Sequence, residues 1–202
     1  EMRYWKFVQW CFDTQAAALK VYANARGVAL MGDLPIFIAH HSVDCWARPD
    51  LYCLDDQFQP TVVAGVPPDD MGPDGQRWGN PLYRWDRMAS EDFAWWTARV
   101  RRALDHADVF RIDHFRGFAG YWEIPATCPT AKEGTWQPGP GKPLFDAIAR
   151  ALGTLPIVAE DLGLITPDVI ALRHGCGFPG MKILQFAFGG DGTHEFLPHN
   201  YT

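Results

Sequence analysis

The sequence predicts an α/β fold built on a mostly parallel sheet. Segments with helical spacing of apolar residues alternate with short apolar runs, and three of these runs end in an acidic residue. Such alternation is typical of βα units, in which buried parallel strands are almost continuously apolar. Because the carboxyl ends of parallel strands meet at one edge of a sheet, Asp33, Asp113 and Glu160 are expected to face one site.

Composition restricts the class of protein. The 202 residues are 48% hydrophobic and 21% charged, as in one ordinary globular domain. A net charge of −6 without a cluster of Lys and Arg argues against a nucleic-acid partner or an anionic membrane. No apolar run approaches the ~18 residues of a membrane span. The five cysteines are odd in number and contain no C-x-x-C pair, which favours a reducing compartment over disulfides or a zinc module.

Four segments have the apolar spacing of helices, and each carries an end signal such as a capping residue or a glycine. The helices are expected at 5–26, followed by Gly27 as C-cap; at about 91–106, with Ser90 as N-cap; near 144–152, closed by Gly153; and from Thr166 and Pro167 to Gly175.

Four apolar runs follow these helices and are predicted as strands. The runs are 28–31, which leads into Gly32–Pro35; 109–113; 155–160; and 181–186.

The connection from about 39 to 89 is too long for an ordinary βα loop. It contains Gly- and Pro-rich turns on both sides of Trp78, and irregular connections of this length are usually lids, binding loops or linkers. A linker would need a separate core on each side, and the 38 residues before it are too few. We therefore expect a lid-like loop on a single unit spanning 1–202, with no second domain.

The acidic residues have the arrangement of a glycosidase site. Arg111 and Asp113 lie on one face of their strand, where the arginine would lower the pKa of Asp113 and keep it ionised as a nucleophile. Glu160 follows a purely apolar run, so burial would raise its pKa toward that of a general acid, and the adjacent Asp161 points the other way. One ionised and one protonated carboxyl flanking a sugar bond form the minimal apparatus. The alternative is a structural Arg111–Asp113 ion pair with Glu160 merely hydrogen-bonded.

Five segments in order along the chain resemble the amylomaltases, which are 4-α-glucanotransferases related to the α-amylases. The segments are Gly32–Phe37, Gln76–Tyr83, Phe110–Gly117, Val158–Gly163 and Pro179–Phe186.

The resemblance implies a (β/α)₈ barrel of the amylase superfamily, of which only about four central units are present, corresponding to the third to sixth strands. It also implies that the chain is an internal fragment, because it ends just before the family's His-Asp pair, whose Asp is the third catalytic carboxylate. Half a barrel would expose strand edges and apolar surface. We therefore expect the isolated chain to be unstable and inactive.

The resemblance also assigns roles to residues. Asp113 would be the nucleophile and Glu160 the acid and base of a retaining double displacement, with no cofactor. The substrate-binding residues that it implies are Asp33, Trp78, Arg111, His114 and Asp191, the last on the acceptor side.

The pair His40 and His41 and the loop tip 69–75 bear on metal binding and on substrate specificity. His40-His41-x-x-Asp44 invites a metal interpretation, but neighbouring residues in an extended segment face opposite ways and no third ligand has suitable spacing, so no metal is expected. His41 stands where the family more often has an acid, and the loop tip 69–75 lacks the family's usual aromatic residue. Both departures bear on acceptor specificity.

The predicted function is transfer of α-1,4-glucan segments between maltooligosaccharides, with donor and acceptor sugars as the partners. An amylase-type hydrolase on the same barrel and a non-catalytic glucan-binding protein are the alternatives. The predicted location is the cytoplasm, or a plastid.

Overall fold

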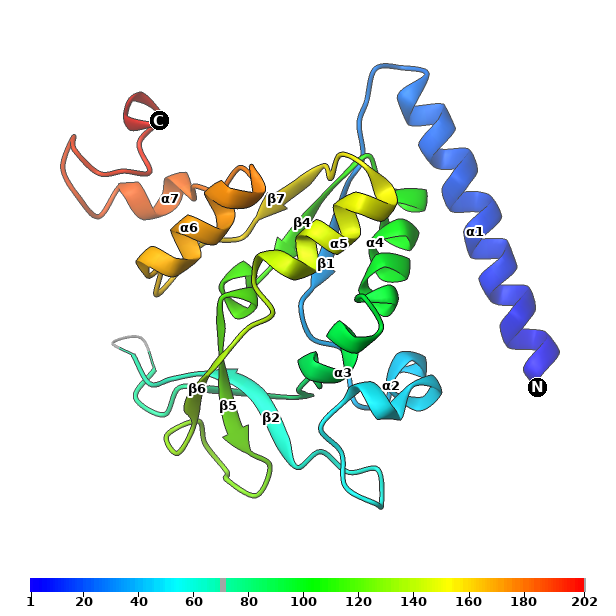
Figure 1. Ribbon diagram of the computed structural model, residues 1–202. Helices are drawn as coiled ribbons and strands as arrows, with labels where there is room; N and C mark the ends of the chain where they lie inside the picture. The colour runs from blue at the N-terminus through cyan, green and yellow to red at the C-terminus, as the bar shows by residue number, and fades with distance from the viewer. Residues whose placement is uncertain (70–71, 202) are drawn as a thin grey trace.

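A computed structural model describes residues 1–69 and 72–201, and its centre is a parallel sheet (Figure 1). The sheet has the order β1-β4-β7, formed by β1 (Met31–Pro35), β4 (Val109–Asp113) and β7 (Ile157–Ala159). The predicted parallel α/β arrangement is confirmed. The first strand begins at Met31 rather than at residue 28, because the Leu30 N–H donates to the Asp108 carboxylate (2.7 Å) instead of joining the ladder.

A second, antiparallel sheet lies beside the first, below it in Figure 1. Its order is β3-β2-β5-β6, from β2 (Val62–Val66), β3 (Gln76–Pro81), β5 (Gly120–Pro125) and β6 (Thr135–Pro138). The segment 39–89 therefore contains strands where the sequence predicts an irregular loop, because the apolar run 62–66 finds partners on both sides. Whether this segment moves as a lid stays a prediction.

Helices pack beside the parallel sheet and on one another. The α-helices are α1 (Met2–Asn24), α2 (Val43–Ala47), α3 (Trp85–Ser90), α4 (Ala94–His106), α5 (Lys142–Leu152), α6 (Pro167–Cys176) and α7 (Leu184–Ala187); 3₁₀ turns occur at Pro49–Leu51, Phe115–Phe118 and Pro198–Asn200. Helix α4 contacts β1, β4, α1 and α5, and α5 contacts α6. The predicted helices at α1, α5 and α6 are confirmed, with Gly153 at the end of α5. Two predicted ends are wrong: the C-cap of α1 is Ala25 rather than Gly27, and α6 continues through Gly175 to a C-cap at Gly177. No helix among the described residues combines the length and apolarity that crossing a membrane requires.

Ser90 is not the N-cap of α4, contrary to the sequence prediction. It ends α3, and its hydroxyl donates to the Arg87 carbonyl (2.7 Å). Asp92 and Phe93 then adopt left-handed backbone angles (φ 49° and 53°), which interrupts the helix before α4 begins at Ala94.

The predicted strand at 181–186 does not form. The Ala159 N–H donates to the Pro179 carbonyl (2.9 Å), but the Met181 N–H donates to the Asp161 carboxylate (2.8 Å) rather than to a strand. The chain then leaves the sheet and coils into α7, with Phe186 59% exposed. A short apolar run has the same pattern in either conformation, and the available hydrogen-bond partners decide between them.

The core lies between the parallel sheet and α4, α5 and α6, and it is strongly aromatic. Phe110 and Ile112 point from β4 into this core, where Trp96, Phe118 and Phe145 pack edge to face. Most of the abundant rings therefore contribute packing area. In contrast, α1 leaves a row of aromatic side chains more than half exposed, namely Tyr4, Trp5, Phe7, Trp10 and Phe12. This exposure agrees with the apolar surface expected of half a barrel.

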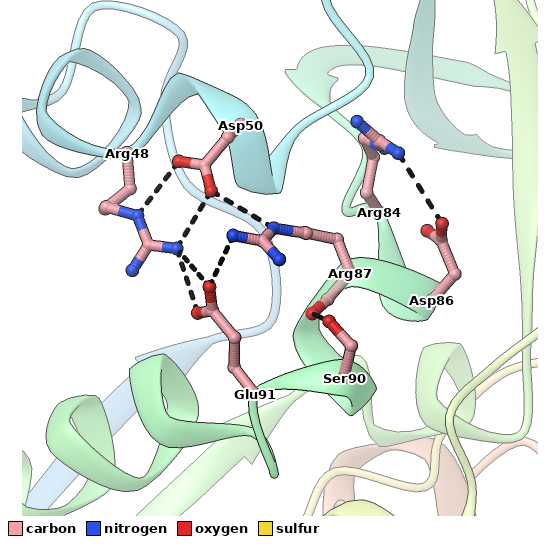
Figure 2. A network of polar contacts seen from close by, with 7 residues as sticks. All are labelled: Arg48, Asp50, Arg84, Asp86, Arg87, Ser90 and Glu91. Carbon is pink, nitrogen blue, oxygen red and sulfur yellow. Dashed lines mark hydrogen bonds and ion pairs between the residues drawn. The ribbon is translucent and has the colours of Figure 1, made fainter.

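A network of ion pairs fastens the turn after α2 to α3 (Figure 2). Arg48 donates to both oxygens of Asp50 (2.9 Å each) and of Glu91 (3.0 and 2.9 Å), and Arg87 contacts Glu91 at 2.7 Å. The side chains are 27–43% exposed, so each pair contributes at most about 1 kcal/mol. The network therefore orients this part of segment 39–89 more than it stabilises it.

We expect Gly65→Ala to destabilise the protein by about 2–3 kcal/mol. A Cβ at Gly65 in β2 would lie 2.1 Å from the Gln76 carbonyl oxygen on β3 and 2.6 Å from Ile124 Cδ1, so the strands would have to separate. Urea unfolding of the product of the complete reading frame measures the loss. Gly120→Ala is the matched control, because its nearest neighbour lies at 3.4 Å; equal midpoints for the two variants would contradict the packing argument.

Candidate active site

Three acids meet where the parallel strands end. The register pairs Asp33 with Arg111 and Pro35 with Asp113 across β1 and β4, and Glu160 directly follows β7. Asp113 and Glu160 stand at strand ends as predicted, whereas Asp33 lies in the middle of β1, which continues to Pro35, and joins the site through its pairing with Arg111.

Arg111 lies between two carboxylates. Its Nε and a terminal nitrogen donate to the two oxygens of Asp33 (3.0 and 2.8 Å), and the same terminal nitrogen contacts Asp113 at 2.9 Å. The hydrogen bonds that Arg111 donates to Asp33, followed by the charge of Asp113, raise the pKa of Arg111. The guanidinium thus orients both carboxylates, and charged hydrogen bonds of this kind are strong and directional.

Glu160 is half-buried and fixed by backbone donors. Its two oxygens accept from the N–H groups of His114 (2.8 Å) and Leu162 (3.1 Å). Burial raises the pKa of this carboxyl above its usual range, and the charge of Asp113 adds to the rise. The backbone hydrogen bonds and Arg111 act in the opposite direction but do not cancel it. The predicted direction of the shift is confirmed, and it suits a group that must carry a proton near neutral pH.

Asp161 points away from this cluster, as the alternation of side chains predicts. Its carboxylate pairs with Arg173 at 3.0 Å. Only Glu160 of the two consecutive acids therefore faces Arg111 and Asp113.

His114 and Trp78 form one wall of the site. Their rings meet edge to face, with centroids 4.8 Å apart. They line a cavity of about 160 Å³ beside Asp113, together with Pro35, Ile36, Phe37 and Asn80. Trp78 is 38% exposed and donates from its indole to Gln76 (3.0 Å), so part of its ring is available to a ligand.

Asn80 is a site residue that the sequence analysis does not single out. Its side-chain amide donates to the Ile38 carbonyl (2.8 Å), which holds β3 beside the chain that follows β1. The sequence feature that could have indicated Asn80 is its position in the segment Gln76–Tyr83. It follows Trp78 by two residues, so the two side chains lie on the same face of β3.

Other candidates from the sequence lie apart from this cluster. The Asp191 carboxylate accepts from the backbone N–H (2.8 Å) and hydroxyl (2.6 Å) of Thr193, and within the described chain no contact joins it to Asp113 or Glu160. His40 Nε2 donates to the Phe58 carbonyl (2.8 Å). Within residues 1–69 and 72–201 no cluster of three or more metal-ligating side chains occurs. Of the loop tip 69–75, residues 70 and 71 lie outside the described residues.

We expect His114 to make the protein less stable as the pH falls from about 6.5 to 4. Burial, and then the charge of Arg116, lower the pKa of His114 to about 4. Below about pH 6.5 the His114 side chain therefore takes up a proton in the unfolded state but not in the folded state. The contribution of His114 to the free energy of unfolding is complete above pH 6.5 and is lost as the pH falls toward 4. The loss is at most about 3 kcal/mol.

The measurement is the free energy of unfolding from pH 7 to 4 for His114→Asn, since Asn tolerates the left-handed backbone at this position (φ 52°). The variant should show a flatter pH dependence than the wild type, whereas His41→Asn at an exposed histidine should not. Parallel curves for wild type and His114→Asn would contradict the assignment.

Acids gather toward the carboxyl ends of three adjacent parallel strands, with Arg111 between two of them, and this arrangement is typical of an α/β barrel of the amylase superfamily. A family described as 4-alpha-glucanotransferase matches residues 1–202. The chain therefore belongs to the 4-α-glucanotransferase family.

Relatives support this membership over the whole chain. A 4-alpha-glucanotransferase from Thermus thermophilus is 54% identical over all of this chain, and a chloroplastic/amyloplastic one from Solanum tuberosum is 49% identical over 96% of it. An amylomaltase from Streptococcus agalactiae in complex with acarbose superposes on 96% of the chain with a TM-score of 0.92 and 48% identity. The chain spans 40%, 34% and 39% of the lengths of these three proteins.

Proposed function

We propose that the protein carrying this chain is a 4-α-glucanotransferase that moves α-1,4-glucan segments between maltooligosaccharides by a retaining double displacement. The observation that carries the proposal is Arg111 held between Asp33 and Asp113, with the half-buried Glu160 directly after the neighbouring strand β7. Family membership supports the same activity. The acarbose complex of the Streptococcus agalactiae relative supports a sugar ligand.

In the first step, an oxygen of Asp113 attacks the anomeric carbon of the donor. The bond from that carbon to the leaving glucan oxygen breaks, and Glu160 gives its proton to this oxygen. In the second step, the Glu160 carboxylate removes the proton from a 4-hydroxyl of the acceptor, and the resulting oxygen displaces Asp113 from the anomeric carbon. Two inversions restore the α configuration, and no cofactor takes part.

The remaining residues bind sugar and exclude water. Asp33 would accept hydrogen bonds from hydroxyls of the reacting sugar while Arg111 holds its carboxylate in place. The Trp78 ring, packed on His114, would stack on a sugar and shield the intermediate from water. Asp191 would contact the acceptor.

Products formed from maltotriose test the proposal. Transfer gives glucose together with oligomers longer than maltotriose, whereas hydrolysis gives only glucose and maltose. The assay uses the product of the complete reading frame. Glucose and maltose alone would favour the hydrolase, and binding without any product would favour a non-catalytic glucan-binding protein.

The proposal extends to location and partners. The five cysteines are free thiols in the structure, which suits a reducing compartment such as the cytoplasm or a plastid. The Solanum tuberosum relative is described as chloroplastic/amyloplastic. Donor and acceptor α-glucans are the expected partners, with no nucleic acid or membrane.

A further inference from the structure

We propose that Asp161 is a positioning residue that holds the Glu160 carboxyl in place for proton transfer. The inference rests on the proposed function, because it concerns the acid step of that reaction. Its basis is the geometry of the chain on both sides of Glu160.

Asp161 ties the end of β7 to two other parts of the chain. One carboxylate oxygen accepts the Met181 N–H at 2.8 Å, and the other lies 3.0 Å from Arg173 Nε on α6. The side chains of this ion pair are 15% and 21% exposed, so solvent screens it little.

The backbone of Glu160 is fixed from the opposite side. Its N–H donates to the Ile112 carbonyl of β4 (2.9 Å), and its carbonyl accepts from the Phe115 N–H (3.1 Å). Because consecutive side chains point opposite ways in an extended segment, Asp161 anchors one side of the peptide that carries Glu160. A shift of that peptide would move the Glu160 carboxyl relative to Asp113.

Gly180 leaves the space that the Asp161 carboxylate occupies. A Cβ at position 180 would lie 2.4 and 2.7 Å from the two carboxylate oxygens. The Pro179 carbonyl accepts from the Ala159 N–H (2.9 Å), and Arg173 donates to the Phe178 carbonyl (3.2 Å). The turn 178–181, the end of α6 and Asp161 therefore form one interlocked unit behind Glu160.

Loss of this support should impair proton transfer more than sugar binding or nucleophilic attack. A glucan leaving group needs a proton from Glu160, whereas a nitrophenolate leaves without one. The ratio of kcat/KM for maltotriose to kcat/KM for 4-nitrophenyl α-maltotrioside therefore reports on the acid step alone. A merely structural defect would lower both values equally.

The experiment compares Asp161→Asn with the wild type in the product of the complete reading frame. Asp161→Asn should lower kcat/KM for maltotriose by about 10- to 100-fold, and for the nitrophenyl substrate by less than about threefold. Gly180→Ala should give the same selective loss, because its Cβ displaces the carboxylate. This second variant decides the question if Asp161→Asn does not fold.

Two further variants calibrate the result. Glu160→Ala should show the selective loss in its strongest form. Asp92→Asn, at an exposed ion pair with Arg150 (2.7 Å), should leave kcat/KM for both substrates unchanged. A selective loss in Glu160→Ala but equal losses, or none, in Asp161→Asn and Gly180→Ala would overturn the role of Asp161 alone. A wild type without transfer, or Glu160→Ala without selectivity, would overturn the proposed function and this inference together.

Discussion

Asp113→Asn should reduce the turnover of maltotriose by about 10⁴-fold or more. An uncharged amide cannot form the covalent bond to the anomeric carbon that the double displacement requires. Asn has almost the same size, and Arg111 keeps its two hydrogen bonds to Asp33, so the fold should survive. The measurement is the initial rate of glucose release by the product of the complete reading frame.

Binding separates loss of chemistry from loss of structure. The affinity of Asp113→Asn for maltooligosaccharides should stay within about tenfold of the wild type, because Asp33 and Trp78 remain in place. Retention of more than a few per cent of the wild-type rate would contradict the nucleophile assignment. A non-catalytic glucan-binding protein would bind with either residue and have no activity to lose.

Glu160→Gln should reduce kcat/KM for maltotriose by about 10²- to 10⁴-fold and abolish the alkaline limb of its pH profile. The first step needs Glu160 protonated, and burial raises the pKa of this carboxyl. Wild-type activity should therefore persist above the ordinary range of a glutamic acid and fall as the pH rises through the raised pKa. Gln does not titrate, so the residual activity of the variant should lack this fall.

The comparison is kcat/KM from pH 4 to 9 for wild type and variant. Asp92→Asn, at an exposed ion pair with Arg150 outside the Asp113 cavity, is the control and should retain the wild-type profile. An unchanged alkaline limb in Glu160→Gln would assign the titration to another group and remove Glu160 from the acid role.

Local pattern predicts much of the parallel sheet and little of the antiparallel one. The alternation of residues in 109–113 predicts a strand with one apolar and one polar face, and β4 has these two faces. In contrast, β2 and β5 form an antiparallel pair between segments far apart in the sequence, with Val62 opposite Pro125 and Gly65 opposite Trp122. Such contacts join distant parts of the chain, so the local pattern does not reveal them.

The failed predictions have similar causes. Ser90 has the residue type of an N-cap, but the left-handed Asp92 and Phe93 place the helix start three residues later. The run 181–186 looks like a strand, but the Asp161 carboxylate takes the N–H of Met181.

The positions of Asp113 and Glu160 are predictable because strand ends meet at one edge. The pairing of Asp33 with Arg111 cannot be predicted from the local pattern, since it depends on the register between β1 and β4. The sequence likewise predicts the direction of the Glu160 pKa shift from the apolar run before it, but not the backbone donors of His114 and Leu162 that orient its carboxyl. The role of Asp191 at the acceptor side stays a prediction.

The most direct measurement is to trap the covalent intermediate and locate it. A 5-fluoro maltosyl fluoride has a good leaving group and a ring that slows release of the intermediate, so the product of the complete reading frame should accumulate the glycosyl-enzyme. Mass spectrometry of tryptic peptides should then find the maltosyl label on the peptide 112–116, at Asp113. A label on any other residue, or turnover of the fluoride without a covalent adduct, would contradict the assignment of Asp113 as the nucleophile of a retaining enzyme.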